Sequence, residues 1–313
     1  MSYSNSEIFD IQRGYRDGRP NILTAKVLHF QGLNASEVEY LFAHPKVEVL
    51  EFHNCYWDIW SKEPKTTHTT AHAIKLVETP MTDCKLGDIF CRFPKLRSLV
   101  YFRPSEEVDT WLDDMGRELA KNGQNLEHLE LYNDSLMPFS APFGSLQSLE
   151  NLKTLEIDLE LLIGFRDNPK GYDDYGGEEY LFLETEDEEE EEEPDYDEIH
   201  RYAGDWSLVK LLPHSLEKLT IHIEQPKLEV YFNTYERFGA KFEELMTAAG
   251  FFDNLHWVEA PRLNMVAEKL CGKSNTGWAL IGQSKHVMAR PPLRIELKAD
   301  ASDSSVADTE TVA

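Results

Sequence analysis

Leu126-Glu-His-Leu129-Glu-Leu131 is the clearest copy of a phrase that recurs along this chain of 313 residues. An apolar residue is followed three and five positions later by two more, and a small or polar residue often comes three positions after the last. Such a phrase is typical of a short strand whose alternate residues point towards a core. Good copies begin at Val47, Leu96, Leu152 and Leu216, and weaker ones are Ala25/Leu28/Phe30, Ile74/Val77/Thr79 and Leu255/Val258/Ala260.

The spacing of the copies indicates a repeat architecture. Taking the central apolar residue as the marker gives positions 28, 50, 77, 99, 129, 155, 219 and 258, so the first six are 22, 27, 22, 30 and 26 residues apart. Leucine-rich repeats are about 20 to 29 residues long, and each unit buries its apolar face only when neighbours stack on it. We therefore predict an α/β fold: an irregular leucine-rich-repeat solenoid, with a curved parallel sheet and helices or loops on its convex side.

The segments between the copies carry turn and helix signals. We predict returning helices over 36–44, 105–122 and 235–249, because serine is a good N-cap and glycine suits the residue after a helix. An ordinary α/β protein of unrelated amphipathic elements is the alternative, but leucine itself recurs at the same positions of the phrase. Proline or asparagine often stands just before the phrase, as in Pro45-Lys, Pro94-Lys, Gln124-Asn125, Glu150-Asn151 and Pro213-His-Ser.

Negative charge is concentrated in one segment. The chain has 57 acidic and 31 basic residues, but 173–198 holds 16 acidic residues and no lysine or arginine, which leaves 41 acidic and 31 basic residues elsewhere. A polyanionic run buries too little surface to offset its ordering entropy, so we expect a disordered acidic insertion over 166–205. This insertion accounts for the 64-residue gap between Leu155 and Leu219. Nucleic acid and membrane surfaces, which bind basic footprints, are not expected partners.

The remaining chain divides into three parts. We expect an N-terminal segment or cap over 1–20, the repeat domain over 21–290 and a flexible C-terminal tail over 291–313. No apolar run reaches the roughly 18 residues of a membrane-spanning helix, and the first residues lack a basic and apolar leader. A cytoplasmic or nuclear location is therefore expected, and the four cysteines are typical of buried thiols in a reducing compartment. We expect a monomer.

With these phrases in view, the chain resembles the leucine-rich half of the divergent fungal F-box and leucine-rich-repeat-like proteins, over residues 21–270. The resemblance implies a substrate-recruiting adaptor. Residues 1–24 hold no recognisable F-box, so the sequence does not support an association with a ubiquitin ligase. The phrases that carry the resemblance are Phe93-Pro-Lys-Leu-Arg-Ser-Leu, Asn125-Leu-Glu-His-Leu-Glu-Leu and Leu212-Pro-His-Ser-Leu-Glu-Lys-Leu-Thr-Ile.

The sequence offers no convincing motif for catalysis or cofactor binding. Gly272-Lys-Ser lacks the first glycine of a phosphate-binding loop, because Ala267 stands at that position. The Gly-x-Ser-x-Gly elbow of hydrolases does not occur. We therefore expect no enzyme, no cofactor, and no catalytic or metal-binding residue. One conceivable zinc set lacks the close paired spacing of structural sites; its members are His68, His72, Cys84 and Cys91.

The outward residues of the predicted strands form rows on the concave face, the surface through which leucine-rich repeats commonly bind. These rows mix aromatic side chains with acids. That composition suits protein recognition, because aromatic residues supply buried contacts and charges set partner choice. A merely solvated polar face is the alternative. The candidate protein-binding residues are Glu51, His53, Phe102, His128, Glu130, Tyr132, Glu156, Asp158, Thr220 and His222.

Two functions are consistent with these features. The first is a non-enzymatic protein-binding module, of adaptor or substrate-recognition type, that uses the concave face. The alternative is an acidic chaperone-like protein, similar to leucine-rich acidic nuclear phosphoproteins, that binds histones or other basic proteins through the 173–198 loop. The expected partner is a protein in both cases and a basic one in the second.

Overall fold

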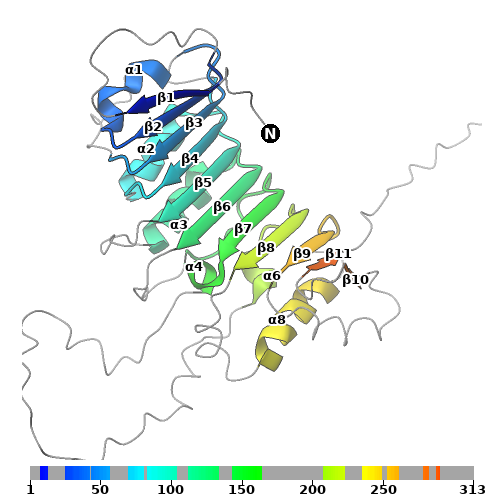
Figure 1. Ribbon diagram of the computed structural model, residues 1–313. Helices are drawn as coiled ribbons and strands as arrows, with labels where there is room; N and C mark the ends of the chain where they lie inside the picture. Colours follow the sequence, from blue (N-terminus) through cyan, green and yellow to red (C-terminus); the bar gives the residue numbers. More distant parts are fainter. Residues whose placement is uncertain are drawn as a thin grey trace, which may run out of the picture.

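The computed structural model describes residues 8–12, 25–42, 44–56, 70–80, 83–103, 112–133, 143–163, 207–222, 235–248, 252–260, 278–281 and 287–289. The predicted insertion over 166–205, the tail over 291–313 and most of the 1–20 segment lie outside these residues. Within them the fold is α/β and is built on one open, mostly parallel sheet, which confirms the predicted fold class at that level (Figure 1). None of the helices in this part of the chain is long and apolar enough to cross a bilayer.

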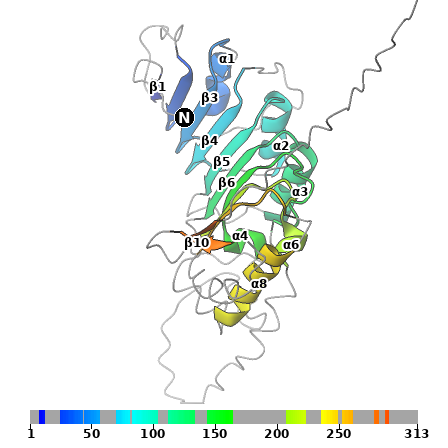
Figure 2. The same ribbon diagram turned by 90° about the vertical axis from the view of Figure 1, so that its right-hand side faces the viewer.

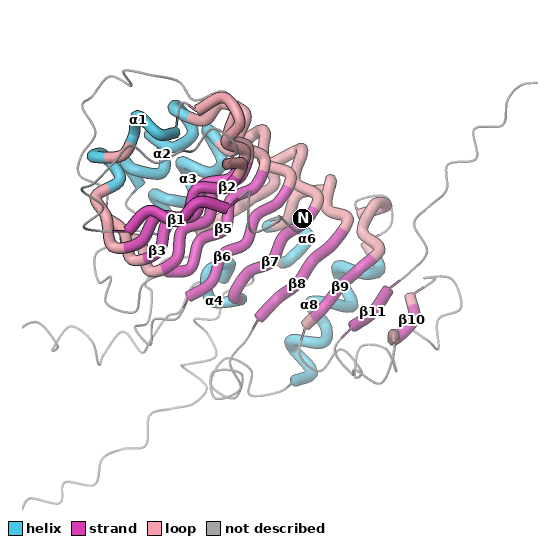
Figure 3. Tube along the Cα trace, turned by 45° about the horizontal axis from the view of Figure 1, so that its top comes forward, coloured by secondary structure: helices cyan, strands magenta, loops and turns pink. Residues whose placement is uncertain are grey.

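The sheet contains eleven strands in the described residues, and nine of them follow chain order. From β1 to β9 every neighbouring pair is parallel, whereas β11 pairs antiparallel with β9 and β10 antiparallel with β11. Figure 3 shows β5 to β9, β11 and β10 side by side in that order. Parallel neighbours need a returning segment between them, which each repeat supplies. The strands are β1 Ile8–Gln12, β2 Val27–Gln31, β3 Val49–His53, β4 Ala73–Val77, β5 Ser98–Arg103, β6 His128–Asn133, β7 Thr154–Asp158, β8 Lys218–His222, β9 Trp257–Glu259, β10 Ala279–Leu280 and β11 Val287–Ala289.

The described helices pack against one face of this sheet. Figure 2 shows α1, α2, α3 and α6 on one side of the strands, and the buried helix residues join a single core with the inward residues of the strands. We call the other face, which carries the outward residues of β2 to β9, the open face. The helices are η1 Ala35–Glu37, α1 Glu39–Phe42, α2 Asp83–Arg92, α3 Leu112–Asn122, α4 Leu159–Ile163, α6 Leu208–Leu211 and α8 Tyr235–Thr247.

The central apolar residues of the phrase form one unbroken row through the core. Parallel pairing places them opposite one another from strand to strand, and each is at most 1% exposed. Burying one such side chain contributes roughly 1.5 to 3 kcal/mol, so this row and its neighbours are the main source of stability. The row consists of Leu28, Leu50, Ile74, Leu99, Leu129, Leu155, Leu219 and Val258.

One predicted copy has the wrong register. The sequence pattern marked Val77 as the central residue, but the sheet pairs Ile74 with both Leu50 and Leu99. Val77 lies three residues after Ile74, as the phrase requires, yet the alternating burial of β4 turns Val77 towards the open face. The corrected spacings, from 50 to 74 and from 74 to 99, are 24 and 25 residues, which makes the repeat more regular.

A repeated turn precedes the strands and accounts for the prolines and asparagines in front of the phrase. Pro45 and Pro94 occupy the second position of two such turns, where the fixed φ of proline fits. Asn125 donates its side-chain N–H to the carbonyl of Pro94 at 2.9 Å, and Asn151 donates to the carbonyl of Gln124 at 2.8 Å. The same main-chain bond, to the carbonyl three residues earlier, is made by the amides of Val47, Leu96, Leu126, Leu152, Leu216 and Leu255.

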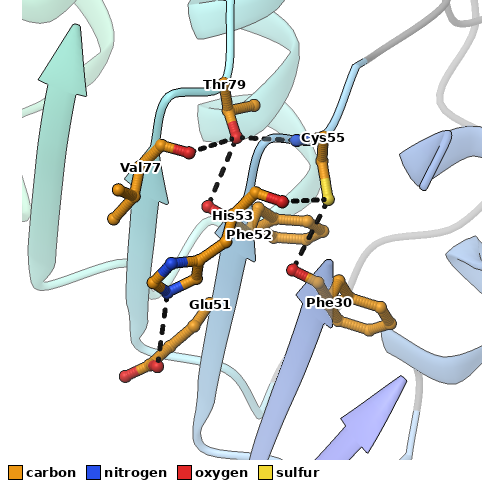
Figure 4. A network of polar contacts seen from close by, with 7 residues as sticks. All are labelled: Phe30, Glu51, Phe52, His53, Cys55, Val77 and Thr79. Atoms are coloured by element: carbon orange, nitrogen blue, oxygen red, sulfur yellow. Dashed lines mark hydrogen bonds and ion pairs between the residues drawn. The ribbon is translucent and has the colours of Figure 1, made fainter. Parts of the chain in front are cut away.

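The small or polar residue that follows the phrase links successive repeats. The thiol of Cys55 lies 3.5 Å from the carbonyl oxygen of Phe30 on the preceding strand, and its amide donates to the hydroxyl of Thr79 at 3.3 Å (Figure 4). Thr79 occupies the equivalent place in the next repeat and donates to the carbonyl of Val77 at 3.0 Å or of Phe52 at 3.3 Å. Burial raises the pKa of the Cys55 thiol, so the group stays protonated and remains a donor.

The helix predictions are partly right. The range 36–44 overlaps η1, which begins at Ala35, and contains the single turn α1 instead of one helix. The other two predicted ranges contain α3 and α8. The sequence did not predict α2, where Gly87 in the middle weakens the helical signal. The return segments therefore vary, while the strands repeat.

Candidate functional site

The outward residues of the strands fall into three rows on the open face. All ten candidate residues occupy these rows, and the predicted alternation of buried and outward residues holds for all of them except Thr220. Over β3 to β8 the first row is Val49, Ala73, Ser98, His128, Thr154 and Lys218; the middle row is Glu51, Lys75, Val100, Glu130, Glu156 and Thr220; the third row is His53, Val77, Phe102, Tyr132, Asp158 and His222.

Five candidates on β5 to β8 meet in one group, which we call the tyrosine cluster: Phe102, Glu130, Tyr132, Glu156 and His222. The rings of Phe102 and Tyr132 are stacked, with centroids 4.2 Å apart and planes 10° apart. The Tyr132 hydroxyl donates to Oε1 of Glu156 at 2.5 Å, and Nε2 of His222 lies 2.8 Å from the same oxygen. Polar and aromatic groups are therefore held in fixed positions on the open face.

Hydrogen bonds set the charge state of Tyr132 and Glu156. Burial would by itself raise the pKa of Glu156, but the bonds from Tyr132 and His222 outweigh burial and hold that pKa below its usual value. Burial raises the pKa of the Tyr132 hydroxyl, and its bond to Glu156 raises it further. Glu156 is therefore an ionised acceptor and Tyr132 a protonated donor at neutral pH.

The carboxylate of Glu130 is partly buried beside another negative charge. It faces Glu156 directly across β6 and β7, and like charges in that position repel. Burial raises the pKa of Glu130 above its usual value, and the charge of Glu156 adds to the effect. The one hydrogen-bond donor near it within the described residues is the Tyr132 hydroxyl, 3.4 Å from Oε2, whose single proton is shared with the closer Glu156. The cluster therefore carries more negative charge than its own donors neutralise.

Two further candidates form a separate group nearer the N-terminal end of the sheet. Nε2 of His53 lies 3.9 Å from Oε2 of Glu51 (Figure 4), and its ring packs edge-on against His29, with centroids 4.4 Å apart. Burial lowers the pKa of His53, and His29 lowers it further. At neutral pH this group presents an uncharged imidazole beside an acid.

The last three candidates lie around the tyrosine cluster. His128 is exposed in the first row, and Asp158 pairs in register with His222 at the end of β7. Thr220 follows Glu156 in the middle row but is only 4% exposed, a degree of burial that its polar character did not predict.

Lys75 and His29 are residues of the open face that the candidate set omits. Nζ of Lys75 lies 5.8 Å from the ring centroid of Phe102. Lys75 and His29 were both missed because the candidate rows were taken from the five good copies alone, and β2 and β4 carry weak copies. The alternation Ile74-x-Leu76 in β4 is the signal that identifies Lys75, as Leu28-x-Phe30 identifies His29.

No protein-family model matches the chain, and no curated protein matches it at a significant level. Within the described residues, no three His, Cys, Asp or Glu side chains gather in a way that could hold a metal ion.

Glu130→Gln is expected to stabilise the fold at neutral pH by roughly 0.2 to 1 kcal/mol, because it removes the repulsion across β6 and β7. A raised pKa means that ionised Glu130 costs stability in the folded state and that this cost disappears on protonation, so the gain should shrink as the pH falls towards about 4. Glu156→Gln should do the opposite: its lowered pKa makes the charged form stabilising, and that contribution is lost at low pH. Thermal unfolding of both variants across this pH range measures the effects, and a Glu130→Gln protein less stable than the wild type at neutral pH contradicts the assignment.

Proposed function

We propose that the chain is a leucine-rich-repeat solenoid that works as a non-enzymatic protein-binding module. In this proposal the open face is the concave binding surface, and the tyrosine cluster is its centre. The observation that carries the proposal is the stacked pair Phe102 and Tyr132, held beside two carboxylates on adjacent strands. The solenoid architecture is supported by the parallel strands, which follow chain order, and by the buried row, to which each repeat contributes one apolar residue.

The cluster has the composition of a recognition surface. Aromatic rings provide large contact area at low cost in conformational entropy, and interfaces are enriched in them. Tyr132 is held in place by its ring contact and its bond to Glu156, so little side-chain freedom is lost on binding. Neighbouring acids set the charge of the partner. An adaptor that presents a bound protein substrate, as the family resemblance implies, is the use we propose for such a face.

Site-specific photo-crosslinking in the cells of origin tests this function. A benzoylphenylalanine in place of His128, which is exposed in the first row, should form a covalent adduct with a partner protein. The same residue in place of Lys121, whose side chain is 73% exposed on α3, should form none. Both positions are exposed to solvent. A difference in adduct formation therefore shows which surface contacts the partner, and does not reflect how exposed each position is.

Deletion of residues 173–198 distinguishes protein binding through the open face from binding of basic proteins through the acidic segment. The adduct from His128 should persist in the deleted protein, because the open face does not include that segment. An adduct that forms from Lys121 and not from His128, or that disappears with the acidic segment, contradicts binding through the open face. Loss of the adduct on deletion of the acidic segment would favour the acidic chaperone-like alternative.

A further inference from the structure

The middle row of the open face presents acceptor atoms without matching donors. Both hydrogen bonds to Glu156 reach Oε1, and the single long bond to Glu130 reaches Oε2. Within the described part of the chain, Oε2 of Glu156 and Oε1 of Glu130 accept no hydrogen bond. The two carboxylates lie side by side in register, on strands that are about 4.8 Å apart.

Thr220 is the next residue of the row and gives an independent observation. It pairs in register with Glu156, its side chain is buried, and its hydroxyl oxygen has no hydrogen-bond partner in the described residues. Buried hydroxyl groups are normally paired, and those that are not require an explanation. Thr220 extends the run of unsatisfied oxygens from β6 and β7 to β8.

The lysines of the open face do not satisfy these oxygens. Nζ of Lys75 lies over the ring of Phe102 and Nζ of Lys218 over the ring of Trp257, each 5.8 Å from the ring centroid. Neither ammonium forms an ion pair with Glu130 or Glu156 within the described residues. The positive charges of Lys75 and Lys218 therefore act on Glu130 and Glu156 only at longer range, without a direct contact in the described residues.

We propose that Glu130, Glu156 and Thr220 form a subsite for an arginine side chain of the partner protein. This inference rests on the proposed binding function and names the chemistry of its partner. A guanidinium is planar, carries five N–H donors and has no acceptor, so it can bond two neighbouring carboxylates at once. A lysine ammonium is a point charge with three donors and cannot bridge the pair in that way. The stacked rings of Phe102 and Tyr132 lie beside the subsite and suit the apolar stem of arginine.

Fluorescence polarisation with three labelled heptapeptide libraries tests the subsite. Their central residue is fixed as arginine, lysine or citrulline, which is the neutral analogue of arginine, and all other positions are random. The full chain should bind the arginine library about tenfold more tightly than the lysine library, and the citrulline library most weakly. Equal binding of the arginine and lysine libraries would overturn the inference.

Two double variants that each remove two negative charges test whether the preference for arginine depends on Glu130 and Glu156. E130Q/E156Q should lose the preference for arginine over lysine, whereas E150Q/E259Q, which removes two carboxylates outside the candidate set, should keep it. The 173–198 segment is present in every protein, so its attraction for cations cancels in the comparison. Thr220→Val, a change of nearly equal volume, should reduce the preference by about half or more without disturbing the fold. A preference that survives in E130Q/E156Q contradicts the subsite.

Failure of the inference can be distinguished from failure of the proposed function. If F102A/Y132A abolishes the binding of all three libraries while arginine has no advantage, the open face binds peptides but the arginine subsite is wrong. If F102A/Y132A leaves the binding of every library unchanged, the open face is not the binding surface and both proposals are wrong.

Discussion

Gly116→Ala is expected to destabilise the fold by about 3 kcal/mol, the largest effect of any single substitution considered for the scaffold. Gly116 lies inside α3, at a point where the helix backbone approaches the main chain of Phe143. A methyl group there would overlap the carbonyl oxygen of Phe143 and lie 2.6 Å from its carbonyl carbon. A main-chain carbonyl cannot rotate away as a side chain can, so α3 or the segment before β7 has to shift.

Gly87→Ala is the matched control, because it makes the same change inside the neighbouring helix α2. The added methyl group would meet Oε2 of Glu118 at 2.7 Å, which is the far end of a flexible side chain that accepts one hydrogen bond, from the Asn122 side chain. Moving that side chain costs little, and alanine favours the helix by about 1 kcal/mol over glycine. Urea unfolding should therefore give a lower midpoint for G116A and an unchanged or higher midpoint for G87A. Equal stabilities of the two variants would contradict the close approach of α3 to Phe143.

The five good copies of the phrase predicted both the strands and the rows of the open face. Alternation has a period of two residues, so a correct register assigns every side chain to a face. Leu129 and Leu155 fix the inward side of β6 and β7, and this places Glu130 and Glu156 side by side outside. Tyr132 and Glu156 lie diagonally across β6 and β7, so their contact depends on side-chain conformation, which the alternation does not predict.

The weak copies of the phrase do not predict the register of their strands. In β4 both Ile74 and Val77 satisfy the apolar spacing, and only pairing with β3 and β5 decides between them. β10 and β11 have two and three residues, too few for an alternation pattern to be distinctive. β1 has five, but Ser6 stands where the phrase has its first apolar residue. The burial of Thr220 and the close approach at Gly116 depend on tertiary packing, so no local pattern indicates them.

Combined replacement of Phe102 and Tyr132 by alanine is expected to weaken binding of the cross-linked partner by about a hundredfold or more. Large aromatic residues at the centre of an interface often cost about 2 kcal/mol each when truncated, a factor of roughly 30. In this cluster the loss of Tyr132 also removes the donor that holds Glu156, so the effects of the two substitutions should not simply add. Circular dichroism and thermal unfolding check that the double variant is folded.

Equilibrium binding of the purified partner to three proteins tests the central claim most directly: the wild type, F102A/Y132A and Y40A/Y56A. The control pair removes two aromatic side chains, 71% and 44% exposed, that lie outside the three rows of the open face. The proposed function predicts a loss of about a hundredfold or more for F102A/Y132A and no more than about a twofold change for Y40A/Y56A. A folded F102A/Y132A protein that binds as tightly as the wild type would contradict the assignment of the open face.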